Sequence, residues 1–205
     1  MIKNIIFDMG NVLIRFDPGY FIERIGVTDA EDRKLLMRGV YQSLEWTRMD
    51  RGSLTDEEAA DIMCSRLPEH LWPAVRALTV EWDRPILPIE GMEALVRELK
   101  GLGYGIYLLS NASLRQKVYW PRIPGSECFD GRVISSEEKL VKPQPEIYRL
   151  ILNRYNLKAE ECVFIDDSTC NAEGAFYTGI TPIVFHGDVK ETREALIRLG
   201  VSVRV

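Results

Sequence analysis

Side chains able to do chemistry stand at the ends of short apolar runs in this sequence. Asp8 follows the first run, Ser110 and Asn111 follow the second, and Asp166-Asp167 closes a later one. Lys142 precedes a helical pattern that comes after the third run. Open α/β sheets gather their ligands at the carboxyl ends of parallel strands, so we expect these residues to form one site.

The residue types at these positions suit phosphoryl transfer. The Asp8 carboxylate can attack phosphorus only if its own charge and that of the phosphate are offset by a cation. Three carboxylates with loop carbonyls offer the oxygen ligands that Mg²⁺ takes in proteins. Lys142 would add a positive charge beside the phosphate oxygens, and the Ser110 hydroxyl would donate a hydrogen bond to them. Gly10 would let the backbone approach the phosphate closely.

The elements that must position these residues are predicted by the apolar pattern. Five short apolar runs predict strands buried on both faces, at residues 3–7, 104–109, 132–135, 162–165 and 181–185. Residues 89–100 carry a one-sided apolar stripe with Gly101 as a stop, and a further helix is predicted from Pro145 onward. The alternation of strands and helices predicts an α/β fold, a Rossmann-like parallel five-stranded sheet flanked by helices.

The interval between the first two predicted strands indicates an inserted unit. Residues 8–103 far exceed the loop and helix that a crossover between parallel strands needs. The interval contains capping-box spacings and an apolar stripe, at Thr28 with Glu31, at Thr55 with Glu58, and through Leu35, Leu36, Val40 and Leu44. We therefore predict an α/β core formed by residues 1–15 and 85–205, and a small α-helical cap over residues 16–84.

Composition excludes several classes of protein. A net charge of -5, from 26 Lys+Arg and 31 Asp+Glu, provides no basic field for a nucleic acid. No run approaches the roughly 18 apolar residues of a membrane span, and Asp8 interrupts any signal-peptide core, so a cytoplasmic location without membrane contact is expected. The four cysteines form no CxxC pair and there are two histidines, which indicates neither a zinc site nor a disulfide framework.

Four segments occur in a characteristic order: FDMGNVL, LLSNAS, KPQPEIY and FIDDSTCN. Together they resemble the four motifs of haloacid dehalogenase-like (HAD) hydrolases, and the insertion after the first strand lies where this family carries its helical C1-type cap. The resemblance implies that Asp8 is the nucleophile that forms an aspartyl-phosphate. It also implies that Ser110 and Lys142 bind the phosphoryl group, and we expect Asn111 to line the same subsite.

The same resemblance implies a Mg²⁺ site and a substrate class. Asp8 and Asp167 would bind the ion directly, Asp166 would bind it through water, and Gly10 would contribute its backbone carbonyl. The expected activity is hydrolysis of a small phosphorylated metabolite by a monomer or homodimer. The D-x-G-N-V start resembles bacterial sugar phosphatases of the α-D-glucose-1-phosphate phosphatase type, which makes a sugar phosphate a candidate substrate.

One residue departs from the family pattern. Phosphatases of this family usually carry a second aspartate two residues after the nucleophile as general acid and base, and here that residue is Gly10. Such help is commonly worth roughly 10²–10⁴ in rate. Asp17 is a nearby candidate proton donor. In the predicted cap, Trp46, Arg48 and Arg51 are candidates for contact with the rest of the substrate.

Three alternatives to a phosphatase follow from the same residues. A metal-independent haloacid dehalogenase would use the aspartate on carbon, but it would have no reason to gather Asp166-Asp167 near an anionic nucleophile. A signalling receiver places its acidic pair before the phospho-accepting aspartate, whereas Asp8 comes first here. A catalytically weakened phosphate-binding or regulatory protein stays open because of Gly10.

Overall fold

The computed structural model describes residues 1–204 and contains a five-stranded sheet in which all neighbouring strands are parallel. The strands are β1 (Asn4–Phe7), β2 (Gly105–Ser110), β3 (Gly131–Ile134), β4 (Cys162–Asp166) and β5 (Thr181–Val184). Their order across the sheet is β3-β2-β1-β4-β5. The predicted Rossmann-like sheet is confirmed, and every strand end lies within one residue of its predicted position.

The register of the sheet sets which residues meet at its carboxyl edge. Phe7, the last residue of β1, lies opposite Leu108 of β2 and Ile165 of β4. The next residues along β1 and β4 are Asp8 and Asp166, which therefore leave the sheet side by side. In this parallel register, acidic residues that each come at the end of an apolar run meet at the same edge of the sheet and form one site.

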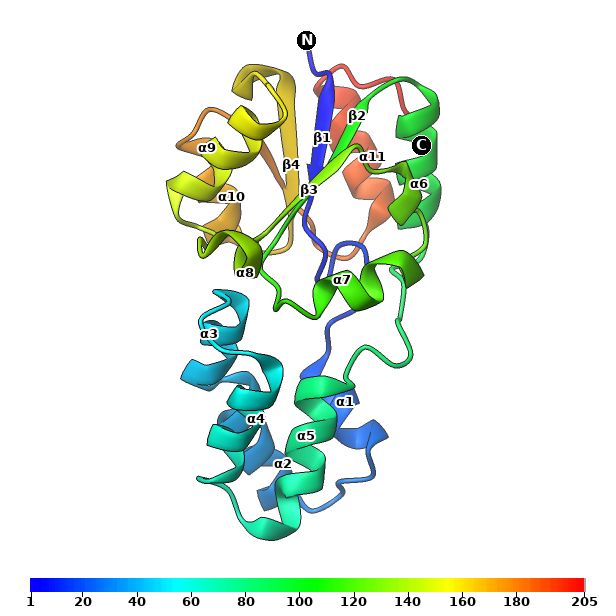
Figure 1. Cartoon of the computed structure of the whole chain (residues 1–205). Helices are drawn as coiled ribbons and strands as arrows, with labels where there is room; N and C mark the ends of the chain where they lie inside the picture. Colours follow the sequence, from blue (N-terminus) through cyan, green and yellow to red (C-terminus); the bar gives the residue numbers. More distant parts are fainter. Residues whose placement is uncertain (205) are drawn as a thin grey trace.

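Helices cover both faces of the sheet, as Figure 1 shows. They are α6 (Met92–Gly101) and α11 (Val189–Arg198) on one face, and α9 (Pro145–Arg154) and α10 (Thr169–Phe176) on the other. Side chains alternate accordingly along β1: Ile5 and Phe7 pack into the core of the first face, and Ile6 packs into that of the second. Shorter helical turns complete this part of the chain: α7 (Gln116–Tyr119), η3 (Trp120–Arg122), η4 (Ser126–Cys128), α8 (Ser135–Glu138) and η5 (Ala159–Glu161).

A second group of helices lies beyond the carboxyl ends of the strands, in the lower half of Figure 1. It comprises α1 (Pro18–Arg24), α2 (Ala30–Leu36), η1 (Met37–Tyr41), α3 (Leu44–Asp50), α4 (Asp56–Cys64), η2 (Glu69–Leu71) and α5 (Trp72–Val80). We call residues 18–80 the helical lobe. Two connections, residues 8–17 and 81–91, join it to the sheet, so the lobe is held at the edge where the strands end.

Two details of the lobe differ from the sequence prediction. The capping box at Thr55 and Glu58 is confirmed, but the one predicted at Thr28 and Glu31 is wrong. Asp29 caps α2 instead, because its carboxylate accepts hydrogen bonds from the first free amides of that helix. The predicted apolar stripe also breaks: Leu36 and Val40 are buried and Leu35 and Leu44 are exposed, since η1 and a new N-cap at Ser43 shift the helix face.

Helix α6 keeps its predicted stripe but not its predicted ends. Its buried side chains are Met92, Leu95, Val96 and Leu99. The helix begins after Gly91, which has a positive φ of 80°, and the left-handed residue that follows its last turn is Gly103 rather than Gly101. Within residues 1–204, no helix has both the length and the apolar character needed to cross a membrane.

Candidate active site

A buried ammonium joins two of the predicted site residues at the carboxyl edge of the sheet. Lys142 Nζ lies 2.7 Å from Asp8 Oδ1 and 2.6 Å from Asp166 Oδ2. The Lys142 side chain is 1% exposed and that of Asp166 is fully buried. Charges so deeply buried are stable only when they are paired and hydrogen-bonded, so this arrangement fixes all three side chains.

Amide side chains hold both partners in place. Asn111 makes two hydrogen bonds to the main chain of Lys142: its Oδ1 accepts from Lys142 N at 2.8 Å and its Nδ2 donates to Lys142 O at 3.1 Å. Asn171 Nδ2 donates to both carboxylate oxygens of Asp166, and Ser168 N donates to Oδ1. Asn171 therefore supports the acidic loop, whereas Asn111 contacts the lysine backbone in addition to lining the site.

Asp167 is oriented by a residue that the sequence motifs did not single out. Asn11 Nδ2 donates to Asp167 Oδ2 at 3.1 Å, and Asn11 Oδ1 accepts from Phe16 N at 2.9 Å. Asn11 adopts a φ of 53°, a left-handed conformation that asparagine tolerates better than most residues. The asparagine after Gly10 in the first motif was the available signal.

The cluster carries more negative than positive charge. Burial and the Asp166 carboxylate raise the pKa of Asp8 to about 6, although Lys142 opposes the shift. Burial by itself lowers the pKa of Lys142, but the carboxylates of Asp8 and Asp166 outweigh it and leave that pKa raised. Burial also raises the pKa of Asp167. One ammonium thus faces three carboxyl groups, and the excess of negative charge can be offset by a bound cation.

The carboxylates lie close enough to share a metal ion. Asp8, Asp166 and Asp167 each offer an oxygen, and these atoms lie within 4.8 Å of one another. All three donors are hard oxygens, and the cavity also reaches Gly10, whose carbonyl is the predicted fourth ligand. This donor set fits Mg²⁺ and lacks the thiolate or imidazole ligands that zinc prefers.

A cavity of about 230 Å³ opens over these carboxylates. Residues of the sheet edge and of the lobe line it together, among them Asp8, Gly10, Asn11, Phe16, Trp46, Met49, Asp50, Asp56, Trp82, Asn111, Ser113, Tyr119, Lys142 and Asp167. Ser110 is the last residue of β2, one residue beyond the predicted strand end, and it is almost fully buried and is not among the residues that line the cavity. The structure therefore brings the predicted site residues to the carboxyl edge of the sheet. Two of them do not line the cavity: Ser110 is buried, and Asp166 is buried in its ion pair with Lys142.

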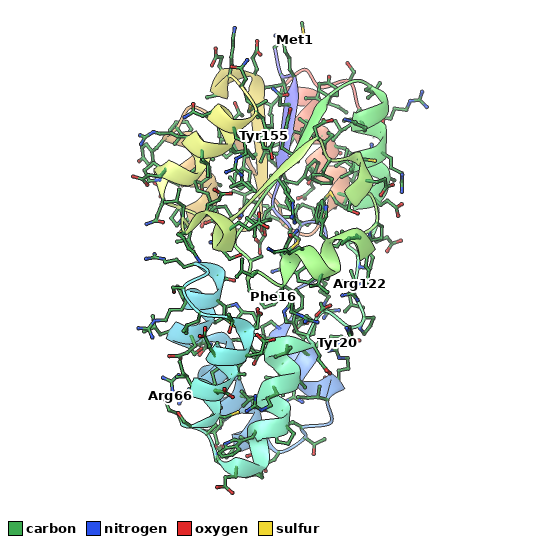
Figure 2. The ribbon with its side chains drawn as sticks, viewed as in Figure 1. Met1, Phe16, Tyr20, Arg66, Arg122 and Tyr155 are labelled. Carbon is green, nitrogen blue, oxygen red and sulfur yellow. The ribbon has the colours of Figure 1, made fainter. Side chains whose placement is uncertain are left out.

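Aromatic side chains also line the cavity. The Phe16 ring centroid lies 5.7 Å from that of Trp46 and 5.2 Å from that of Trp82, and Tyr119 packs on Trp82 at 5.2 Å. Figure 2 shows Phe16 at the junction between lobe and sheet. The cavity thus combines charged and aromatic lining residues, which is the usual composition of a small-molecule site.

Of the other residues that the sequence suggested for substrate contact or proton donation, one lines the cavity and the rest do not. Trp46 lines the cavity, but Arg48 and Arg51 do not. Arg48 extends toward Glu45 on its own helix, and Arg51 is exposed. Asp17 caps α1 by accepting from Tyr20 N, and that bond together with Arg15 lowers its pKa, so it is a poor proton donor.

Two acidic residues of the lobe line the cavity and were missed. Asp50 ends α3, and Asp56 begins α4 and accepts from Ser113 Oγ at 2.7 Å. Asp56 was hidden because an acid in the first turn of a helix is ordinary. Asp50 had a usable signal: a carboxylate at the negative end of a helix dipole is unfavourable unless something else requires it.

The fold and site define an α/β protein with an acidic, lysine-containing ligand site at a parallel sheet edge. The family model of haloacid dehalogenase-like hydrolases matches residues 2–177, so the chain belongs to that family. The predicted resemblance is confirmed at this level.

Two of the relatives are named as phosphatases of different substrates. Sesquiterpene phosphatase astK of Aspergillus oryzae is 28% identical over 187 residues, which cover 87% of each chain. A D-ribitol-5-phosphate phosphatase of Bacteroides thetaiotaomicron is 27% identical over 188 residues, covering 83% of this chain and 85% of that protein.

Solved structures share the fold. HAD family enzyme bt-2542 of Bacteroides thetaiotaomicron, in a complex with magnesium and inorganic phosphate, superposes with a TM-score of 0.69 at 22% identity, covering 94% of this chain and 99% of that one. L-2-haloacid dehalogenase of Xanthobacter autotrophicus superposes with a TM-score of 0.67 at 14% identity, covering 99% and 85%. The two scaffolds are similarly close in shape, so the residues of the site must decide between phosphatase and dehalogenase chemistry.

Proposed function

We propose that the protein is a Mg²⁺-dependent phosphatase that hydrolyses a small phosphorylated metabolite through an aspartyl-phosphate on Asp8. The observation that carries this proposal is the carboxylate cluster of Asp8, Asp166 and Asp167 around Lys142, open to a cavity. A dehalogenase needs no cation and gains nothing from the two further carboxylates. The names of the two relatives, both phosphatases, support the same function.

In this mechanism Asp8 attacks phosphorus in line with the leaving oxygen. Lys142 binds an equatorial phosphate oxygen and keeps Asp8 oriented, while Asn111 fixes the Lys142 backbone. Mg²⁺ would be held by Asp8, Asp167, the Gly10 carbonyl and, through water, Asp166, and it would supply the positive charge that lets the Asp8 carboxylate approach the phosphate. Ser110 remains a proposed hydrogen-bond donor to the phosphoryl group.

We further propose that residues 16–84 act as a cap that closes the cavity. Three contacts between residues 16–84 and the rest of the chain support this role. Ser135 Oγ donates to Asp50 O at 2.5 Å, Ser113 Oγ donates to Asp56 Oδ1 at 2.7 Å, and Arg115 Nε donates to Asp83 Oδ1 at 2.9 Å. Such contacts exclude bulk water when closed and would have to break for substrate to enter.

We propose a substrate with a phosphate that Lys142 and the carboxylate cluster with its cation bind, and an organic group that packs on the aromatic lining residues. A sugar or polyol phosphate can stack a ring or chain face on Phe16 and Trp46, and an apolar phosphate can pack there without hydrogen bonds. The sugar-phosphate prediction therefore stays open beside an apolar one, and the two named relatives span the same range.

Phosphate release from a substrate panel tests the proposed function. The panel contains p-nitrophenyl phosphate, acetyl phosphate, glucose 1-phosphate, ribitol 5-phosphate and farnesyl phosphate, with Mg²⁺ or with EDTA. We expect release that requires Mg²⁺ and disappears in Asp8→Asn. Mg²⁺ binding without turnover on any substrate would instead favour the phosphate-binding or regulatory role, and chloride release from a 2-haloacid in EDTA would favour a dehalogenase.

A further inference from the structure

A phosphatase mechanism on this scaffold needs a proton donor that its first motif does not contain. Gly10 stands where the carboxylate would be, so the alkoxide leaving group and the hydrolytic water lack a partner in the segment that follows β1. A replacement must face the cavity, lie near Asp8 and be free of a competing side-chain partner.

Most carboxylates near the cavity fail one of these requirements. Asp56 is engaged by Ser113 Oγ, and Asp17 is engaged by Arg15 and the Tyr20 amide. Asp166 and Asp167 belong to the proposed metal site, where a free proton would compete with the ion.

Asp50 meets all of them. It lines the same cavity as Asp8, and in the described part of the chain no side chain hydrogen-bonds to its carboxylate. Its backbone is fixed, because its carbonyl accepts from Ser135 Oγ, which in turn accepts from Ala112 N at 3.0 Å. The last turn of α3 is thus anchored to the loop that follows β2, which places a carboxylate of the lobe in a site built by the sheet.

We propose that Asp50 is the general acid and general base of the reaction, supplied by the lobe in place of the residue missing at Gly10; this inference rests on the proposed function. In the first step Asp8 forms a bond to phosphorus, the bond from phosphorus to the leaving oxygen breaks, and the proton of Asp50 passes to that oxygen to give an alcohol. In the second step Asp50 takes a proton from water as the water oxygen attacks phosphorus. The bond between Asp8 and phosphorus then breaks, inorganic phosphate leaves, and Asp50 is protonated again.

The electrostatic surroundings of Asp50 suit a group that gives and takes a proton near neutrality. Burial raises the pKa of Asp50 to about 7, with the carboxylates of Asp56 and Asp8 adding to the shift and Lys142 opposing it. Tyr119, which also faces this region, has a pKa raised well above its ordinary value by burial and stays neutral. A group with its pKa near the working pH is the most efficient proton shuttle.

The test compares leaving groups that need a proton with one that does not. In Asp50→Asn, hydrolysis of an alkyl phosphate should fall by roughly 10²-fold or more. With p-nitrophenyl phosphate the same variant should release one equivalent of p-nitrophenol per enzyme rapidly, because that leaving group departs unprotonated. Steady turnover should then be slow, because the aspartyl-phosphate waits for a base.

Two further variants control the comparison. Asp56→Asn removes a carboxylate from the same cavity but should change alkyl and p-nitrophenyl phosphates by the same factor. Gly10→Asp returns a carboxylate to the usual position, where an added Cβ would lie 3.9 Å from its nearest neighbour, Phe16 Cβ. In the Asp50→Asn background it should restore alkyl phosphate turnover and abolish the burst.

The outcomes separate the two proposals. If wild type turns over no phosphomonoester, the proposed function fails, and this inference with it. If wild type is active but Asp50→Asn is either unaffected or equally slowed on both leaving groups without a burst, the proposed function stands and the role of Asp50 is overturned. Should Asp50→Asn not fold, as judged by thermal unfolding, the smaller Asp50→Ser variant repeats the same comparison, and a burst or its absence decides the role of Asp50 in the same way.

Discussion

Lys142 is one buried ammonium beside three carboxyl groups, and this excess of negative charge makes the site suited to a cation. Pairing with Asp8 and Asp166 makes its burial tolerable, but the cluster stays anionic around Asp167. These residues were predictable from the sequence because each acid follows a strand, so the register of the sheet alone brings them together. Asp50 was not predictable in that way, since its position depends on how a helix of the lobe meets the sheet.

Asp50 should cost the protein stability in return for its place in the cavity. Its folded pKa of about 7 lies above the ordinary value of 3.8, so the folded state holds a proton that the unfolded state releases. Stability therefore falls as pH rises from about 4 through 7. Asp50→Asn, which cannot ionise, should be more stable than wild type, and the difference should be about 2–3 kcal/mol larger at pH 8 than at pH 5.

Thermal unfolding without metal at the two pH values measures this difference. For a chain of this length it corresponds to a change of roughly 5–10 °C in the Tm gap between the variant and wild type. A Tm gap that is the same at pH 5 and pH 8 would show that Asp50 ionises no differently in the folded and unfolded states.

At the scale of elements, the turn after α3 brings the lobe into close contact with the sheet domain. Gly52 has a φ of 68°, and a Cβ there would overlap the backbone carbonyl of Ser136 in α8. Lys139 Nζ also donates a hydrogen bond to Gly52 O. This contact lies two residues from Asp50, so it sets how far the proposed acid reaches into the cavity.

Gly52→Ala should therefore separate the lobe from α8. The positive φ costs roughly 1–2 kcal/mol for a non-glycine residue, and the overlap with Ser136 must be relieved by displacement of the turn. We expect kcat/KM to fall by about tenfold or more, as happens when a positioned group moves by an ångström.

Gly26→Ala is the matched control: it has a φ of 81° and no neighbour within 4 Å of its added Cβ. The control should lose only the stability that the positive φ costs and keep its activity, and equal activity losses in the two variants would contradict the role of the turn.

The elements themselves were predictable to different degrees. Strands and α6 follow from apolar runs and stripes that local burial dictates. The break between α2 and α3 did not follow, because the stripe continues through it in sequence. A close packing contact lies at this break: Gly39, within η1, is so near the Leu67 side chain that an added Cβ would lie 2.8 Å from Leu67 Cδ1. Long-range contacts of this kind leave no periodic signal.

At the scale of the whole molecule, the cavity is assembled from segments far apart in the chain. Residues between 8 and 16, between 46 and 56, and between 111 and 113 line it, along with Lys142 and Asp167. The strand-end rule predicts the members that come from the sheet. It says nothing about the members from the lobe, because their positions depend on the two connections and on contacts such as that between Asp56 and Ser113. The carboxylates at the sheet edge were therefore predicted, whereas of the lobe residues that line the cavity only Trp46 was a candidate, and Asp50 and Asp56 were missed.

Binding of Mg²⁺ should stabilise the folded protein to an extent that depends on the ionisation of the site carboxylates. At 100 times its Kd, Mg²⁺ adds about 2.7 kcal/mol to the folded state, which for this chain length is roughly 5–10 °C in Tm. The pKa of about 6 at Asp8 sets the pH dependence: below it the ion must displace a proton, and above it the carboxylate is free. The Mg²⁺-induced rise in Tm should therefore be about half as large at pH 5 as at pH 8. In Asp167→Asn, which loses a proposed direct ligand, the rise should be much reduced at both pH values, with NaCl at matched ionic strength as the blank. An equal rise in wild type and Asp167→Asn would place the ion outside the carboxylate cluster.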